Sequence, residues 1–239
     1  SLEQKGLKNI IRSVDFPTGT VQVTLDKAGV PKYEICENVA WDNIPFDHES
    51  EKLAKTTDAV CFGSLAQRST VSRQSIQNFI NNMSANSLKI FDINLRQHFY
   101  SKEMLIESME MANILKINDE EALIVADLFG YEEKNEEAIC ERLQNNFNFD
   151  IVILTKGIKG SCVFTQHEVS VMDTPIVEVV DTVGAGDSFT AAFVASHLQG
   201  KSLKQSHQLA VDVSAYICTQ QGAMPPLPDY DLNTMKDNV

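Results

Sequence analysis

The segment "DTVGAGDSFTAAF" (residues 181–193) places Gly184, Ala185 and Gly186 between two aspartates and then becomes apolar. The preceding run "IVEVV" (176–180) predicts a strand, and the residues after the glycines predict a helix that ends near Gly200. Such small residues at a helix start leave several backbone N–H groups open, where the helix dipole favours an anion. The segment therefore predicts a phosphate site between a strand and a helix.

The two aspartates suggest different tasks. Asp187 falls in the first helical turn and faces the expected anion, where a carboxylate is repulsive unless it takes a proton from a hydroxyl attacking the phosphate. Asp181, at the expected strand end, is placed to bind a cation. A plain strand-to-helix turn with a capping aspartate is the alternative, because short glycine motifs are weak evidence.

The composition is that of an ordinary globular protein, with 239 residues of which 43% are apolar and 22% charged. The formal net charge of −13 argues against nucleic acid or an anionic membrane as partner, since the field repels phosphates. No membrane span or signal peptide is predicted, and five separated cysteines indicate buried thiols in a reducing compartment. We therefore expect a cytoplasmic protein.

Between residues 58 and 157, short apolar runs alternate with amphipathic segments, which predicts a parallel sheet covered by helices on both faces. The predicted strands cover residues 58–63, 88–95, 113–118 and 150–157. The predicted helices cover residues 69–83, 101–112 (with Ser101 as N-cap), 119–130 (closed by Gly130) and 136–147. Period-two alternation predicts hairpins over 18–44, with a turn near residues 26–29, and over 160–181.

The segment "DTVGAGDSFTAAF" closely resembles the C-terminal signature of the ribokinase-like (PfkB) family of carbohydrate kinases. This resemblance implies that Asp187 is the general base and that the amides of Gly184, Ala185, Gly186 and Asp187 stabilise the transferring phosphoryl group. It also implies a monovalent cation, with K⁺ as the candidate, held by Asp181 and Val183.

Further motifs occur in the family's order. "NDEE" (118–121) matches N-x-x-E, so the resemblance implies that Asn118 and Glu121 order Mg²⁺ and its waters. "DINLR" (92–96) matches D-x-N-x-R, which implies that Arg96 lies over the phosphates. Without the resemblance, the alternative interpretations are that Asn118 caps a helix and that Arg96 forms a salt bridge within a loop.

Two more motifs point to the nucleotide. "TKGIKG" (155–160) matches the family's T-x-G-x-x-G turn, which assigns nucleotide contacts to Thr155, Gly157 and Gly160. A simple strand-to-hairpin turn is the alternative. "TQQGAMPPLP" (219–228) resembles the C-terminal loop beside the nucleotide and the cation and adds Gly222, although the family often has a small polar residue where Pro226 stands.

The resemblance implies a single three-layer α/β/α kinase domain over residues 1–239, in which 18–44 form a small β lid that excludes water. The family's opening strand, with its substrate-binding aspartate, and its glycine-rich signature do not occur before Thr18. We expect a truncated or partly observed chain, and the alternative is a fragment that holds sugar poorly.

The implied function is ATP-dependent phosphorylation of a sugar hydroxyl, with ATP, Mg²⁺ and a sugar as partners and a lid-to-lid homodimer as the assembly. "FGSLAQR" (62–68) resembles fructokinase-like members and favours fructose. A nucleoside or 2-keto-3-deoxygluconate kinase, or a non-catalytic regulatory homologue, remain alternatives.

Several other residues receive no catalytic role. The five histidines show no metal-ligand spacing, and His197 and His207 are expected at the surface. Trp41 is expected to pack at the base of the lid. Lys116 borders the expected nucleotide site, with a solvated surface charge as the alternative.

Overall fold

The computed structural model describes residue 2, residues 5–25 and residues 31–228. Within them, one sheet holds six strands in the order β3-β4-β5-β6-β7-β8. The first four strands are parallel and the last two antiparallel: β3 (Ala59–Phe62), β4 (Leu88–Asp92), β5 (Ile114–Asn118), β6 (Ile151–Thr155), β7 (Ser161–Thr165) and β8 (Val169–Met172).

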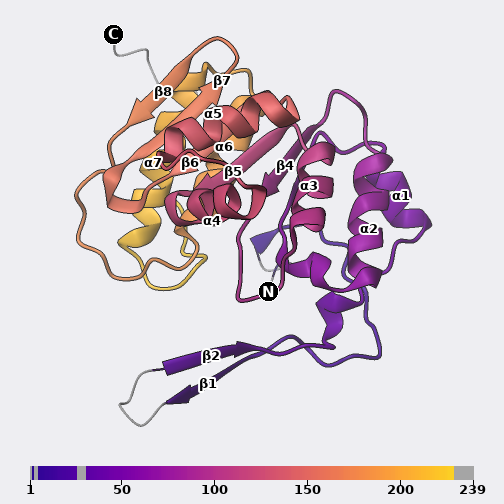
Figure 1. Cartoon of the computed structure of the whole chain (residues 1–239). Helices are drawn as coiled ribbons and strands as arrows, with labels where there is room; N and C mark the ends of the chain where they lie inside the picture. The colour runs from indigo at the N-terminus through magenta and orange to yellow at the C-terminus, as the bar shows by residue number, and fades with distance from the viewer. Residues whose placement is uncertain (1, 3–4, 26–30, 229–239) are drawn as a thin grey trace.

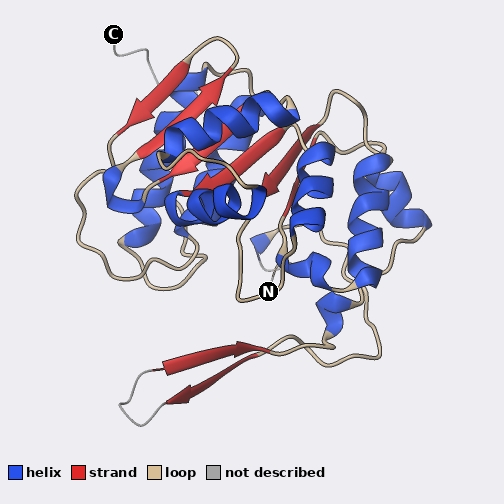
Figure 2. Ribbon diagram, viewed as in Figure 1, coloured by secondary structure: helices blue, strands red, loops and turns tan. Residues whose placement is uncertain are grey.

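Helices cover both faces of this sheet, as Figures 1 and 2 show. Four helices share one buried cluster with the sheet: α2 (Thr70–Asn81), α3 (Lys102–Met111), α4 (Asp119–Phe129) and α5 (Glu136–Phe147). Helices α6 (Ala185–Leu198) and α7 (Leu203–Cys218) share the cluster on the other face. The fold is therefore the expected three-layer α/β/α arrangement.

The layers follow from the alternation of side chains along each strand. Phe91, Leu115 and Val152 enter the cluster under α2–α5, whereas their neighbours Ile90, Ile114 and Ile153 enter the cluster under α6 and α7. Each central strand is thus apolar on both faces, which is why it reads as a continuous apolar run in the sequence.

The predicted elements from residue 58 to residue 157 are confirmed, with ends shifted by a few residues. The hydroxyl of Ser101 accepts the Met104 N–H and caps α3, as expected. Gly130 ends α4 in the left-handed conformation, with φ 74°. Helix α1 (His48–Ala54), which the sequence did not predict, packs against α2.

The prediction of a strand at residues 176–180 is wrong. This segment has no regular structure, and Ile176, Val179 and Val180 are exposed. The N–H groups of Val180 and Asp181 donate to the Cys218 carbonyl at the end of α7, at 2.8 and 3.3 Å. The apolar, β-branched run has strand propensity, but no neighbouring strand pairs with it, so no ladder forms.

The expected burial of several side chains is also wrong. Only Cys140 and Cys162 are buried, while Cys36 and Cys218 are half-buried and Cys61 is exposed because β3 lies at the edge of the sheet. His207, expected at the surface, is fully buried, and His197 is half-buried. Helical position alone does not tell which face of α7 meets the sheet.

The hairpin predicted over residues 18–44 is present as antiparallel strands β1 (Val21–Leu25) and β2 (Pro31–Ile35), with Val23 opposite Tyr33. Its predicted turn near residues 26–29 lies outside the described residues. Figure 1 shows this two-stranded sheet projecting away from the helices and the main sheet.

The base of the hairpin is held to the body by Arg68 at the end of the 3₁₀ helix Leu65–Arg68. Its guanidinium lies between the rings of Trp41 and Phe99, at 4.1 and 4.4 Å from their centroids, and is bonded to the Asp42 carboxylate at 2.8 and 2.9 Å. Trp41 therefore packs at the base of the hairpin, as expected from the sequence.

Candidate active site

The site is built around the first turn of α6. Gly184 is the N-cap of this helix, with φ 83°, and a Cβ there would lie 2.8 Å from the Ala223 carbonyl oxygen. The turn therefore needs glycine both for its left-handed backbone and for its close contact with the C-terminal loop. Of the amides that follow, that of Ala185 donates to the Thr182 carbonyl at 3.2 Å, while those of Gly186 and Asp187 lie in the first turn, where a helix leaves N–H groups without an intrahelical partner.

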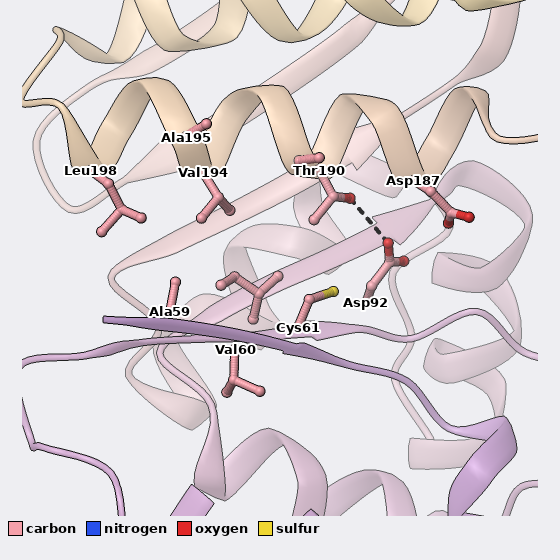
Figure 3. Close-up of a pocket in the computed structure, with 11 residues that line it drawn as sticks. Ala59, Val60, Cys61, Asp92, Asp187, Thr190, Val194, Ala195 and Leu198 are labelled. Atoms are coloured by element: carbon pink, nitrogen blue, oxygen red, sulfur yellow. Dashed lines mark hydrogen bonds between the residues drawn. The ribbon is translucent and has the colours of Figure 1, made fainter. Parts of the chain in front are cut away.

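Two cavities meet at this turn. The larger, of about 620 Å³, is lined by Ala185, Gly186 and Phe189 of α6 together with residues of β7, α7 and the 174–182 loop. The other, a cleft of about 450 Å³, is lined by Asp187 and Thr190 of α6 and by β3 and β4, with Cys61 and Asp92. Figure 3 shows Asp187 and Asp92 at the same end of this cleft. Neighbouring residues of one helical turn thus face different cavities.

The sheet brings the other motifs to the same edge. In the parallel register Asp92 pairs with Lys116, and Asn118 pairs with Thr155. Asp92, Asn118 and Thr155 are the last residues of β4, β5 and β6, and ligands of open α/β sheets bind outside the carboxyl ends of the strands. Three motifs spread over more than 60 residues of the chain therefore share one edge of the sheet.

The predicted nucleotide turn lies in the larger cavity. Thr155, Gly157 and Gly160 line it, and the 3₁₀ helix η4 (Gly157–Lys159) forms part of its wall. The other lining side chains are mostly apolar, and Ile158 and Ile176 are almost fully exposed at 91% and 104%. An apolar slot of this size beside an anion-binding turn can hold a flat base with its phosphates directed toward α6.

Asn118 and Glu121 form a reciprocal capping box at the start of α4. The Asn118 side chain accepts the Glu121 N–H at 2.8 Å, and Glu121 accepts the N–H groups of Asn118 and Leu95 at 3.1 and 2.9 Å. Burial raises the pKa of Glu121 despite these bonds. The helix-cap alternative for Asn118 is therefore present in the structure, and it leaves the predicted metal role untested.

The donor set at Glu121 suits a hydrated Mg²⁺. The described residues contain no cluster of three or more His, Cys, Asp or Glu side chains that could enclose a metal ion. Mg²⁺ commonly keeps several waters and uses one or two carboxylates with substrate phosphates. One fixed carboxylate at this edge of the sheet fits that mode, with contact through water.

Asp181 ties two loops together. Its carboxylate accepts the Val183 N–H at 3.0 Å and the Gly222 N–H at 3.1 Å, and these bonds lower the pKa of Asp181. The structure thus joins three residues that the sequence assigned to a cation site or its neighbourhood. The Asp181 carboxylate is the type of oxygen ligand that a monovalent cation takes, and that role remains a prediction.

Arg96 is not brought to either cavity among the described residues. It is exposed, and its guanidinium donates to the Leu95 carbonyl at 2.9 Å. The loop salt bridge offered as the alternative is not among the ion pairs of the described residues either. Its place over the phosphates remains a prediction.

Sequence reasoning missed a buried polar group beside α6. Lys116 is only 8% exposed, and its ammonium bonds both oxygens of Asp92 at 2.9 and 3.0 Å. The Thr190 hydroxyl donates to Asp92 at 3.0 Å, a contact drawn in Figure 3. A charged residue inside the apolar run "ILKIN" is the signal in the sequence, which placed Lys116 beside the expected nucleotide site with a solvated surface charge as the alternative.

Comparison with known proteins agrees with this geometry. The sequence pattern described as pfkB family carbohydrate kinase matches residues 1–230. A nucleoside kinase of Methanocaldococcus jannaschii is 30% identical over 149 residues, which cover 61% of this chain and 46% of that protein. A fructokinase of Vibrio alginolyticus is 26% identical over 95% of this chain and 76% of its own length.

The uncharacterized sugar kinase PH1459 of Pyrococcus horikoshii is similar in both sequence and structure. It is 29% identical over 93% of this chain and 70% of its own sequence. Its crystal structure superposes with a TM-score of 0.77 at 26% identity, covering 93% of this chain and 71% of that one, and it has also been solved in complex with ATP.

The chain thus spans between about half and three quarters of the length of these relatives. The family pattern nevertheless covers nearly all of the chain, and the fold and the order of its motifs agree with it. The chain belongs to the pfkB family of carbohydrate kinases.

Proposed function

We propose that this protein transfers the γ-phosphate of ATP to a hydroxyl group of a sugar, with Asp187 as the general base. The observation that carries the proposal is the first turn of α6, where Gly186 faces the larger cavity and Asp187 faces the cleft. A donor nucleotide in one space and an acceptor in the other would meet at an anion-binding helix N-terminus.

In the proposed reaction, Asp187 takes the proton of the acceptor hydroxyl as its oxygen attacks the γ-phosphorus. The new oxygen–phosphorus bond forms while the bond to the bridging β-phosphate oxygen breaks, and ADP leaves with that electron pair. The amides of Gly184 to Asp187 would stabilise charge on the transferring group. A magnesium ion bound with the nucleotide would neutralise further phosphate charge, with Glu121 and Asn118 ordering its waters.

Fructose is our first candidate for the acceptor. The resemblance of "FGSLAQR" to fructokinase-like members and the match over most of the chain to the Vibrio alginolyticus fructokinase support it. A nucleoside is the second candidate, because the nucleoside kinase of Methanocaldococcus jannaschii is 30% identical over its matched part. A 2-keto-3-deoxygluconate acceptor or a non-catalytic regulatory role would leave the same motifs in place.

The hairpin β1–β2 is proposed to act as a lid and as the contact of a homodimer. Every residue of β1 is exposed, and Val21, Val23 and Leu25 lie on one face of it. Tyr33, opposite Val23 on β2, is 62% exposed. A second copy of this apolar face would bury these side chains, and one such pair of lids would serve two sites.

An ADP-release assay of the full chain across a panel of sugars and nucleosides tests the function. We expect turnover with a sugar, and Asp187→Asn should lower kcat by about 10²–10⁴, the usual contribution of a general base. Asp127→Asn is the matched control, because Asp127 is an exposed acid on α4 that lines neither cavity. Turnover that survives in Asp187→Asn would remove the base assignment, and the absence of turnover with every acceptor would remove the kinase proposal.

A further inference from the structure

Asp92 and Lys116 form a buried charged pair, because each residue is only 8% exposed. They are direct register partners, Asp92 as the last residue of β4 and Lys116 as the middle residue of β5. Both oxygens of Asp92 accept from the Lys116 ammonium, at 2.9 and 3.0 Å. Burying such a pair is weak evidence for stability, since desolvating two charges offsets most of their attraction. Stability alone therefore does not explain why this pair is buried.

The ammonium lies against the first turn of α6. A Cβ added at Gly186 would be 3.4 Å from the Lys116 Nζ, so this atom packs directly on the backbone of the anion-binding turn. Gly186 also lines the larger cavity, where we place the nucleotide. Lys116 itself is not among the residues that line either cavity, but its ammonium, paired with Asp92, is a positive group beside the point where phosphate charge would develop in a protein of net charge −13.

The Asp92 carboxylate holds the Lys116 ammonium in this position. An ammonium has three donors, and the two bonds to Asp92 leave one for another acceptor. The Thr190 hydroxyl lies 3.0 Å from the second Asp92 oxygen and 3.1 Å from the Gly186 carbonyl oxygen. Thr190 thereby connects the Asp92 carboxylate to the same turn of α6, which limits the positions that the lysine can take.

We propose that Lys116 is a phosphate-binding residue of this site, contacting the γ-phosphoryl group, and that Asp92 and Thr190 are the residues that position it. Lys116 stays protonated and takes no part in bond making. Its positive charge stabilises the negative charge that the phosphoryl oxygens carry during transfer. Asp92 keeps the Lys116 ammonium beside Gly186. This inference rests on the proposed kinase function and adds residues to it.

The first test is calorimetric binding of ATP and of ADP to the full chain, without any acceptor. Because Lys116→Met alone would leave the buried Asp92 carboxylate unpaired, the test variant is the double variant Lys116→Met with Asp92→Asn. We expect at least tenfold weaker ATP binding and less than threefold change for ADP, which lacks the γ-phosphate. Lys55→Met is the control, since Lys55 is an exposed partner of Glu51 on the far helix α1.

The second test separates positioning from structure by kinetics. Asp92→Asn keeps the ammonium but loosens it, so kcat should fall about tenfold or more while KM for ATP changes less than threefold. Thr190→Val should show the same split more weakly, and Lys116→Arg should recover part of the ATP affinity lost in the double variant.

The two tests distinguish failure of this inference from failure of the kinase proposal. Equal weakening of ATP and ADP, or no weakening of either, would overturn the role of Lys116, and equal changes in kcat and KM would overturn positioning by Asp92. If the unaltered chain binds neither nucleotide, the kinase proposal itself fails, and with it this inference. A chain that binds ATP but does not discriminate it from ADP in the double variant leaves the kinase proposal intact and removes only the role of Lys116.

Discussion

At the scale of single residues, Gly160 shows how strongly one backbone position is constrained. Its φ of 97° and ψ of −158° fall in a region open essentially to glycine, and a Cβ there would lie 2.4 Å from the Met172 carbonyl oxygen. We expect Gly160→Ala to lower the free energy of unfolding by about 3 kcal/mol, from strain and a clash with the backbone next to β8.

Gly157→Ala is the comparison for this prediction. Gly157 also has a positive φ, 55°, but nothing lies within 4 Å of an added Cβ, so a loss of about 1 kcal/mol is expected. Urea unfolding of the two variants measures the difference. Equal losses would show that the contact with the Met172 carbonyl has no energetic weight.

Arg68 is the second residue whose environment predicts a measurable effect. Its side chain and that of Asp42 are each 6% exposed. Burial raises the pKa of Asp42, but the hydrogen bonds from Arg68 and the Val39 N–H and the charge of Arg68 together outweigh it and leave that pKa below its ordinary value. Arg68→Met should lower the free energy of unfolding by about 3 kcal/mol or more, because it leaves a buried carboxylate unpaired.

The matched control is Arg142→Met, which removes a pair with Glu133 whose side chains are 41% and 30% exposed. An exposed pair contributes only about 0–1 kcal/mol. Chemical unfolding of both variants provides the measurement. A loss for Arg68→Met no larger than that of the control would contradict a stabilising role for the Arg68 guanidinium, both in its pair with Asp42 and in its stack on Trp41 and Phe99.

At the scale of elements, His207 joins α7 to the β7–β8 hairpin. Its ring nitrogens lie 2.7 Å from the Ser161 hydroxyl and 2.9 Å from the Ser170 hydroxyl, and burial lowers its pKa to about 4. An unfolded histidine, with a pKa near 6.5, binds a proton that the folded one refuses. The free energy of unfolding should therefore fall by about 2 kcal/mol as the pH drops from 7 to 5.

Urea unfolding at several pH values between 7 and 5 checks this prediction. His207→Gln should remove most of the slope, while His167→Gln, at the exposed turn between β7 and β8, should keep it. Carboxylates whose pKa is lowered, such as Asp42, lose their contribution below this window. A slope retained in His207→Gln would assign it to another group.

The elements also show which patterns predict structure. Strands β4 to β6 could be predicted because central strands are apolar on both faces, and their ends carry Asp92, Asn118 and Thr155. The run at 176–180 has the same composition but no partner strand, so composition alone was misleading. The sequence interpretation made no prediction for α7, although Ser202 and Gln205 form a capping box at its start.

At the scale of the whole molecule, the exposed apolar face of the lid predicts association. Val23→Glu places a charge in the middle of this face and should convert a dimer into monomers, as sedimentation velocity would show. Gln22→Glu, on the opposite face of β1, carries the same charge and should leave the dimer intact. A monomeric unaltered chain, or a Val23→Glu dimer, would contradict assembly through the lid.

No described helix is long and apolar enough to cross a membrane, in line with the short apolar runs of the sequence. The whole-molecule shape instead results from covering the two apolar faces of one sheet, which places α6 and α7 opposite the helices α2 to α5. Only this layering brings the first turn of α6 over the ends of β4 and β5, as Figure 3 shows for Asp92 and Thr190.

By itself, the sequence determined the α/β class, most strands and helices between residues 58 and 157, and the motif that carries Asp187, the proposed general base. These features depend on side-chain alternation, caps and glycines, which act between near neighbours in the chain. Only the tertiary structure decided that Lys116 and His207 are buried, that Cys61 is exposed, and that Gly186 and Asp187 face separate cavities. Those outcomes depend on strand register and on which helix covers which face, and both arise from contacts between segments far apart in the chain.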